Sequence, residues 1–305
     1  MRVTQTLLSD RALAALRDSL GRMAKTQQQL GTSKRINTPS DDPAGHSTAT
    51  RLSARIKTLD QYDRQAAAAQ APLGAVSDAM NTLSDLSARA QELAVAGATG
   101  GLGATERTAM GAEVNQLLEE VVAIGNTNQH GRYLLGGRET QTPPLTVTRN
   151  ANGDITAAAW NPRGVDGIID ATITDGVTVH TNIGGTSALG ADTDPTFLPA
   201  LLVQLRDALN TNNQTAVNAV IDQFQTVVAR LGGAQAQVGS QLQAIDRATA
   251  GNDTVRTATK AALSAVADAD VAKVAVDLSQ QQSVYQAALH AASQAIQPSL
   301  LEFLK

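Results

Sequence analysis

The sequence predicts a mainly α-helical protein in which the N- and C-terminal regions form long heptad-patterned helical rods and a small β-rich domain is inserted in the middle. Apolar residues recur at alternating spacings of three and four towards both ends of the chain. Between about 140 and 190 the pattern changes to period two, with Gly and Pro dipeptides. Only 2% of the residues are aromatic although 42% are hydrophobic, which favours a core of Ala, Leu, Val and Ile between closely packed helices.

The first predicted helix ends at a proline-rich turn near residue 40. Its apolar seam consists of Leu13, Leu16, Leu20, Met23 and Leu30, with Gln27 in the remaining seam position. The turn that follows consists of Pro39, Ser40, Asp41, Asp42 and Pro43. A residue before proline is disfavoured in a helix, and Ser and Asp favour helix caps, so this turn separates the first helix from the second.

Two more helices are predicted before the β-rich segment. The second helix extends from about 44 to 97, and Pro72 inside it predicts a kink or a fresh start. A Gly-rich turn at 97–103 then precedes the third helix, for which Thr105 is the predicted cap.

The middle of the chain contains two predicted β-hairpins, each with β-branched strands around a dipeptide that favours a tight turn. The dipeptides are Asn152-Gly153 and Asp175-Gly176, and the strands are 145–149 with 155–159 and 168–174 with 177–183. Prolines border this part of the chain on both sides. We therefore predict that 140–194 is a separable module, whose replacement by a short linker leaves assembly largely intact.

Helical periodicity returns after Pro195. The longest seam alternates spacings of four and three through Val217, Ile221, Phe224, Val228, Leu231, Gln235, Val238, Leu242 and Ile245. Gly232 and Gly233 have poor helix propensity, which predicts close backbone packing against a neighbour at this point. The last predicted helix covers about 253–297, and its apolar side consists of Val271, Val274, Leu278, Tyr285, Leu289, Ala292 and Ile296.

The order of these elements predicts a hairpin in which the two chain ends lie together. Residues 1–35 carry seven basic and two acidic side chains, whereas residues 266–305 carry two basic and four acidic ones. Opposite charges favour association of the two ends, although each exposed ion pair contributes only ~0.2–1 kcal/mol. Ordinary solvated helix faces explain the same charges equally well.

Composition and motifs argue against several functional classes. The net charge of −4 gives no basic footprint for nucleic acid, and the absence of Cys excludes disulfides and Cys-based sites. The four histidines (His46, His130, His180 and His290) lack metal-ligand spacing, and none begins a His-Glu-x-x-His motif. We therefore expect no enzyme activity, no catalytic or metal-binding residue and no cofactor.

No targeting or membrane segment is predicted either. Charged residues between Met1 and Leu20 leave no apolar stretch long enough for a cleaved signal peptide. The uncharged stretch 278–301 contains ten Gln and Ser residues, which is too polar for insertion into a membrane.

Four segments resemble those of bacterial flagellins and hook-associated proteins. Leu30–Ala44 is similar to the end of the family's N-terminal helix and the turn after it. The C-terminal run begins at 278–289 and closes on 298–305, and segments 86–98 and 126–137 are also similar to helical segments of this superfamily. Because all four segments match in the same order, the chain is identified as a member of the flagellin superfamily.

Within the superfamily, the Pro-Ser-Asp-Asp-Pro turn and the ending Ser-Leu-Leu-Glu-Phe-Leu resemble hook-associated proteins of type 3, whereas Gln297-Pro298 is similar to flagellin endings. The resemblance implies three regions: an inner coiled-coil domain (1–43 and 263–305), a helical rod domain (44–139 and 195–262) and an outward β-rich insert (140–194). It also implies a domain-linking turn at Pro39–Pro43. The assembly interface would consist of Leu13, Leu16, Leu20, Met23, Leu30, Val274, Leu278, Tyr285, Leu289, Ala292 and Ile296.

The implied function is that of a structural subunit that joins the hook-associated ring to the flagellar filament. The implied partners are further copies of the chain in a ring, the first hook-associated protein, flagellin, the filament cap during assembly and a cytoplasmic export chaperone. The implied location is extracellular, at the hook–filament junction, after export without a cleaved signal peptide. Flagellin itself and a non-flagellar coiled-coil adaptor are the alternatives, while an enzymatic flagellin would need the zinc motif that is missing.

Overall fold

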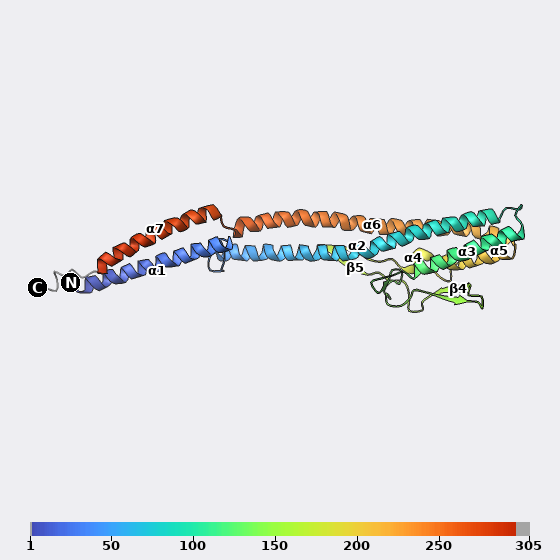
Figure 1. Ribbon diagram of the computed structural model, residues 1–305, viewed down its shortest axis with the longest axis horizontal. Helices are drawn as coiled ribbons and strands as arrows, with labels where there is room; N and C mark the ends of the chain where they lie inside the picture. Colours follow the sequence, from blue (N-terminus) through green and yellow to red (C-terminus); the bar gives the residue numbers. More distant parts are fainter. Residues whose placement is uncertain (1, 297–305) are drawn as a thin grey trace. The chain divides into compact units, whose positions relative to one another are not determined.

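The computed structural model describes residues 2–296 and divides into two compact units. The first unit combines the two ends of the chain, up to Thr58 and from Thr254 onward, and the second is Leu59–Asp253. Helices α2 (Pro43–Gly97) and α6 (Gln214–Ala267) contribute to both units. The predicted fold class is confirmed, because helices dominate and the strands of the described residues all lie between residues 128 and 180 (Figure 1).

In the first unit, helices α1 (Arg2–Thr32) and α7 (Val271–Ile296) lie side by side (Figure 1). Helix α1 ends where Ser33 adopts a left-handed conformation, with φ +55°. The chain then pairs with the end of α6: the Arg35 N–H donates to the Ala267 carbonyl at 2.8 Å, and the Ala269 N–H donates to the Ser33 carbonyl at 3.0 Å. These backbone bonds join the two chain ends.

The break between the last two helices lies at 268–270, and the predicted start of a final helix near 253 is wrong. Helix α6 continues through Gly251 and Asp253 to Ala267. Between them, Asn252 is only 2% exposed, and its side-chain amide donates to the Ile173 carbonyl at 2.8 Å. Asn252 therefore anchors α6 to the β-rich segment at the point where the sequence analysis begins a new helix.

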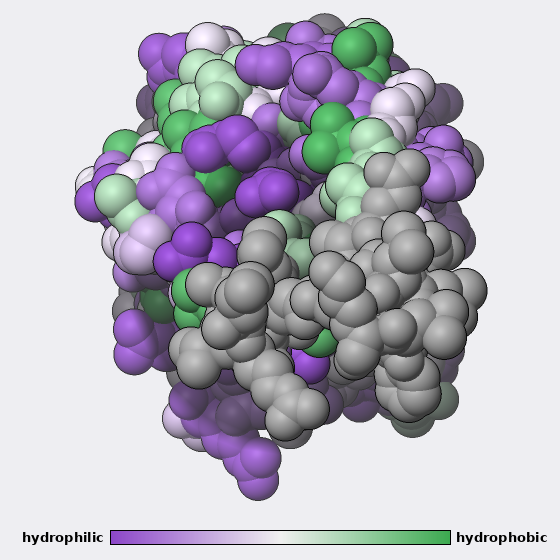
Figure 2. All heavy atoms as spheres, turned by 90° about the vertical axis from the view of Figure 1, so that its left-hand side faces the viewer, coloured by the Kyte–Doolittle hydropathy of each residue, from purple (hydrophilic) through white to green (hydrophobic). Residues whose placement is uncertain are grey.

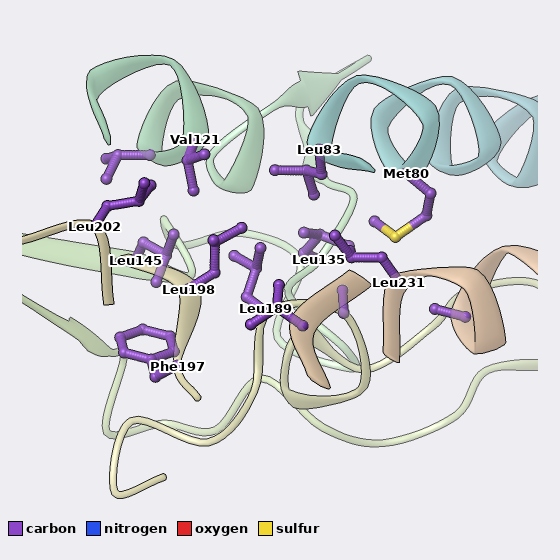
Figure 3. Close-up of a cluster of buried hydrophobic side chains, with 14 of the residues drawn as sticks. Met80, Leu83, Val121, Leu135, Leu145, Leu189, Phe197, Leu198, Leu202 and Leu231 are labelled. Carbon is purple, nitrogen blue, oxygen red and sulfur yellow. The ribbon is translucent and has the colours of Figure 1, made fainter. Parts of the chain in front are cut away.

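The core of the second unit is formed by the second part of α2, by α3 (Ala104–Gly125), by α5 (Leu198–Asn210) and by the first part of α6. Its side chains point towards a common centre from several elements (Figure 3). Leu83, Leu198, Phe197 and Phe224 are all fully buried. Each such side chain contributes ~1.5–3 kcal/mol to the free energy of folding when it is buried, so these residues stabilise the core of this unit.

The segment between α3 and α5 contains a short helix, α4 (Gly185–Leu189), and three separate two-stranded antiparallel sheets. The strands are β1 (Asn128–Gln129) with β2 (Arg132–Tyr133), β3 (Leu145–Arg149) with β4 (Ile155–Trp160), and β5 (Asp170–Thr174) with β6 (Val177–His180). Both predicted hairpins are confirmed. The β1–β2 hairpin was not predicted, because its turn is His130-Gly131, with φ +52° and +81°, instead of a typical Asn-Gly.

The β-rich insert shares the core of the helices. Leu145, Ile155 and Trp160 are buried in the same hydrophobic cluster as α5. The Trp160 ring packs at 5.6 Å from the Phe197 ring, and its Nε1–H donates to the Gly190 carbonyl at 2.8 Å. The insert therefore shares its core with the helices, while its prediction as a separable module with boundaries at 140 and 194 stays a prediction.

Local expectations for the helices have different outcomes. Helix α2 continues through Pro72 as one helix, which excludes the fresh start and leaves the predicted kink as the alternative. Helix α3 begins after Gly103 with no side-chain cap from Thr105. A Cβ added at Gly232 or Gly233 would meet no atom within 4 Å, so neither glycine packs closely within this chain. By contrast, a Cβ at Gly97 would lie 2.5 Å from the Leu209 side chain, a close approach that only glycine permits.

Buried arginines satisfy helix ends in the second unit. Arg107 is 5% exposed, and its guanidinium donates to the Gly97 carbonyl at 2.8 Å, to the Thr99 carbonyl at 2.9 Å and to the Asn212 side chain. Arg230 donates in the same way to the Leu189 carbonyl at the end of α4, at 3.0 Å. Cations are favoured at helix C-termini, where the last carbonyls have no partner within the helix.

Candidate assembly site

The most deeply buried side chains of α1 are small and polar. Ser19 and Thr26 are 4% and 7% exposed, and the Thr26 hydroxyl lies 3.0 Å from Gln281 Oε1 on α7. On α7, Val274 and Ala292 are 9% and 7% exposed. Because small polar side chains bury little apolar area, this contact fixes the alignment of the two helices more than it stabilises them.

The structure brings only part of the predicted interface into this contact. Val274 and Ala292 are buried, and five other predicted residues are half-buried: Leu16, Met23, Leu30, Leu278 and Tyr285. Leu13, Leu20 and Leu289 are 45%, 42% and 47% exposed and point away from it. The Ile296 side chain lies outside those that the structure describes. The exposed leucines are available to another chain, and the predicted interface stays a prediction.

Charge does not hold the two terminal helices together. Among the side chains that the structure describes, no ion pair joins α1 to α7. Arg22 and Asp277 only line the same shallow hollow, together with Ser19 and Gln281. The opposite charges of the two ends therefore make no ion pair within the described part of this pair.

The turn after α1 is organised around Asp41. Its Oδ2 accepts hydrogen bonds from the Asn37 and Thr38 N–H groups at 3.0 and 2.9 Å, and its Oδ1 lies 2.9 Å from the Lys25 ammonium. The Lys25 ammonium, and next the Thr38 N–H, hold the pKa of Asp41 far below its usual range. The carboxylate thus fastens the turn to the last part of α1.

Asp42 begins α2 as its N-terminal cap. Its Oδ1 accepts from the Gly45 N–H at 2.9 Å, and its Oδ2 lies 3.1 Å from the Arg35 guanidinium. The Gly45 N–H, and next Arg35, lower the pKa of Asp42. A Cβ at Gly45 would lie 2.4 Å from this carboxylate and 2.6 Å from the Ile36 side chain, so the cap requires glycine there.

Arg35 connects the turn to the C-terminal half of the unit. One nitrogen of its guanidinium contacts Asp42, and the same nitrogen donates to the Val266 carbonyl at 2.8 Å. Its backbone N–H bonds to Ala267, the last residue of α6. Arg35 therefore links α1, α2 and α6 where the predicted domain-linking turn, Pro39–Pro43, lies.

The described residues were compared with the requirements of a metal site and of a membrane span. They contain no group of three or more His, Cys, Asp or Glu side chains that could hold a metal ion. None of the described helices combines the length and the hydropathy that a membrane span requires. Viewed from the side of the termini, hydrophobic residues are scattered among hydrophilic ones wherever the surface is not grey (Figure 2).

Comparison with known proteins shows what this chain is similar to. Residues 3–140 match the sequence profile of the bacterial flagellin N-terminal helical region. The flagellin of Listeria monocytogenes is 24% identical over 99% of this chain and 98% of its own length. The similarity to flagellins therefore covers the N-terminal helical region and, at low identity, nearly the whole chain.

Hook-associated proteins are also among the proteins that this chain is similar to. Flagellar hook-associated protein 3 of Escherichia coli is 25% identical over 48% of this chain and 46% of its own length. A flagellar hook-associated protein from Vibrio parahaemolyticus has the same fold, with a TM-score of 0.65 at 19% identity, over 74% of this chain and 99% of its own. Hook-associated protein 3 from Legionella pneumophila gives a TM-score of 0.60 at 13% identity, over 71% and 98% of the two chains.

Sequence reasoning missed several residues that organise this candidate site. Ser19, Thr26 and Gln281 form the polar seam, but a search for apolar spacing passes over them. In the sequence, Lys25 and Arg35 stand out only as part of the basic charge of residues 1–35, and their roles in the turn were not predicted. For Gly45, the signal was present, because it lies three residues after an Asp-Pro helix start, where a capping carboxylate binds the backbone N–H.

Proposed function

We propose that the chain is a structural, non-enzymatic subunit of the bacterial flagellum that joins the hook-associated ring to the filament. The observation that carries this proposal is the pair of helices formed by the two chain ends, whose seam is polar while leucines remain exposed on its flanks. Such a pair gains most of its apolar burial from other copies, as expected of a subunit that assembles through its ends. The Pro39–Pro43 turn supports the junction type within the superfamily.

The proposed partners follow from this position. They are further copies of the chain in a ring, the first hook-associated protein, flagellin, the filament cap during assembly and a cytoplasmic export chaperone. The proposed location is extracellular, at the junction between hook and filament. The fold shared with hook-associated proteins and the partial similarity to hook-associated protein 3 support the junction assignment.

The second candidate function is that of flagellin, the filament subunit. It is favoured by the similarity to Listeria flagellin over nearly the whole chain. Immunogold labelling of intact flagella decides between the two. We expect label confined to a band between hook and filament, and the hook to lack a filament when the gene is deleted. Label along the whole filament would establish the flagellin alternative.

A further inference from the structure

A groove of about 690 Å³ lies within the first unit, between the start of α2 and the end of α6. One wall is a single face of α2, with residues three or four apart: His46, Ala49, Thr50, Ser53, Ala54 and Lys57. Leu263 and Ala267 of α6 form the opposite wall. The remaining lining comes from the turn and its neighbours: Thr32, Lys34, Ile36, Asn37 and Asp268.

The groove has the shape of a site that receives a helix. Ala49, Ser53 and Ala54 are small, and Ile36 is an apolar lining residue that is 6% exposed. From its first to its last lining residue, the α2 wall extends ~17 Å along the helix. Two helices separated by small side chains can accept the side chains of a third, as in helix-in-groove recognition.

The charge of the groove specifies the kind of side chain that fits. Lys34 and Lys57 are exposed, and neither makes an ion pair with any described residue. Asp268 is the acidic residue among those that line the groove. An occupant with an apolar face and a neighbouring carboxylate therefore complements this surface.

The chain carries such a face on α7. Val276 and Val284 are 66% and 51% exposed, and Asp277 lies beside Val276. The two valines are separated by ~12 Å along the helix, which fits within the α2 wall. Val284 and Asp277 also line the hollow with Ser19 and Arg22 of α1, so Val276 is the side chain of this flank that is most open to another chain.

We propose that this groove receives the α7 flank of a second copy, with Val276 entering between the small side chains and Asp277 facing Lys34 and Lys57. Because the groove and the flank are different surfaces, each copy offers one of each. The contact is therefore heterologous and builds rings or helical arrays instead of closed dimers. This inference rests on the proposed function, and it names the partner surface and the residues that meet.

Disulfide cross-linking tests the contact directly, because the chain contains no Cys. Lys57→Cys and Val276→Cys are made as separate variants, mixed, assembled on flagella and oxidised. We expect a dimer-sized, reducible band from the mixture, which can only join two copies. Matched controls place the cysteine on the other face of each helix, as Arg51→Cys and Gln282→Cys, both at exposed positions, and these should give no such band.

The outcomes separate this inference from the proposed function. Label at the junction without a Lys57–Val276 cross-link, or with equal cross-linking of the controls, overturns the inference alone. A Lys57→Cys cross-link to another flagellar protein, instead of to Val276→Cys copies, overturns it as well. Label along the filament overturns the junction assignment, while the cross-link between copies still reports on the groove.

Filling the groove provides a second, independent test. Ala54 is exposed in the isolated chain, so Ala54→Trp should leave its helical circular dichroism unchanged. We expect incorporation into flagella to fall by about tenfold or more, because the indole occupies the space for Val276. Ser47 is an exposed residue of the same helix that does not line the groove, so Ser47→Trp is the control. Wild-type incorporation of Ala54→Trp would rule out the proposal.

Discussion

The contact between α1 and α7 and the core of the second unit are built from opposite kinds of side chain. The terminal pair buries Ser19, Thr26 and Ala292, whereas the second unit buries Phe197 and Phe224 completely. The pair leaves leucines and valines exposed on its flanks, whereas the second unit buries most of its large apolar side chains in one cluster. The second unit is therefore stabilised within one chain, whereas under the proposed function the terminal pair gains further burial from other chains.

Removing α1 should have the largest effect on assembly and little effect on the second unit. A chain lacking residues 2–30 loses both the polar seam and the exposed leucines, so we expect no incorporation into flagella. The core around Phe224 is untouched, and limited proteolysis should leave a stable fragment near residues 59–253. A truncated chain that still supports a filament would contradict the idea that α1 is required for assembly.

Core truncation in the second unit should have the largest effect on stability. Phe224→Ala removes a fully buried ring, and we expect it to lower the free energy of unfolding by ~3–5 kcal/mol in urea denaturation. Leu20→Ala is the matched control in the terminal pair. Since Leu20 is 42% exposed, we expect a change within ~0.5 kcal/mol for the isolated chain. Equal losses for both variants would abolish the contrast between the two regions.

The helical layout and both long hairpins followed from the sequence because period and turn chemistry are local. The Asn152-Gly153 and Asp175-Gly176 turns were correctly placed for this reason. The β1–β2 hairpin was not predicted, since its turn residues are not an Asn-Gly or Asp-Gly pair. Trp160 packs against Phe197 in a long-range contact, which no local sequence pattern predicts.

The candidate site was predictable only in part for a related reason. Heptad reasoning selects large apolar side chains, so it found Leu16 and Met23 but also Leu13 and Leu20, which are exposed in the single chain. Ser19 and Thr26, which form the polar seam, lie beside the apolar positions that the heptad pattern selects. The spacing of the prolines located the Pro39–Pro43 turn. The hydrogen bond from Arg35 to the Val266 carbonyl could not be predicted, because the two residues are far apart in sequence.

The buried guanidinium of Arg107 should matter less than the aromatic core. Arg107→Met keeps much of the side-chain volume but leaves the Gly97 and Thr99 carbonyls without their donor. Each lost partner of a buried polar group costs ~1–3 kcal/mol, so we expect a loss in this range or slightly above. The loss should appear in the urea midpoint of the second unit. A stability equal to the wild type would show that water replaces the guanidinium.

The polar seam of the terminal pair predicts a smaller effect that is specific to alignment. Thr26→Val is nearly isosteric but removes the hydroxyl that contacts Gln281. We expect the free energy of unfolding of the isolated chain to fall by at most ~1 kcal/mol. Incorporation should fall more than that of Leu20→Ile, which keeps apolar area at an exposed site. If Thr26→Val assembles normally, apolar contacts alone set the alignment of the helices.

The smallest expected effect concerns the pH dependence of the turn in the first unit. Since the pKa of Asp41 is lowered in the folded chain, its carboxylate favours the ordered turn fully above the ordinary Asp pKa of ~3.9, and this contribution is lost as the pH falls through the lowered value. The amide proton of Thr38, which binds the carboxylate, is the reporter in nuclear magnetic resonance. We expect its shift to remain constant down to about pH 4 and to change only below it. Lys25→Gln removes the largest cause of the lowered pKa, so the change should begin at higher pH, whereas in Asp41→Asn it should be absent. A Thr38 amide that titrates at the same pH with and without Lys25 would show that this ion pair does not organise the turn.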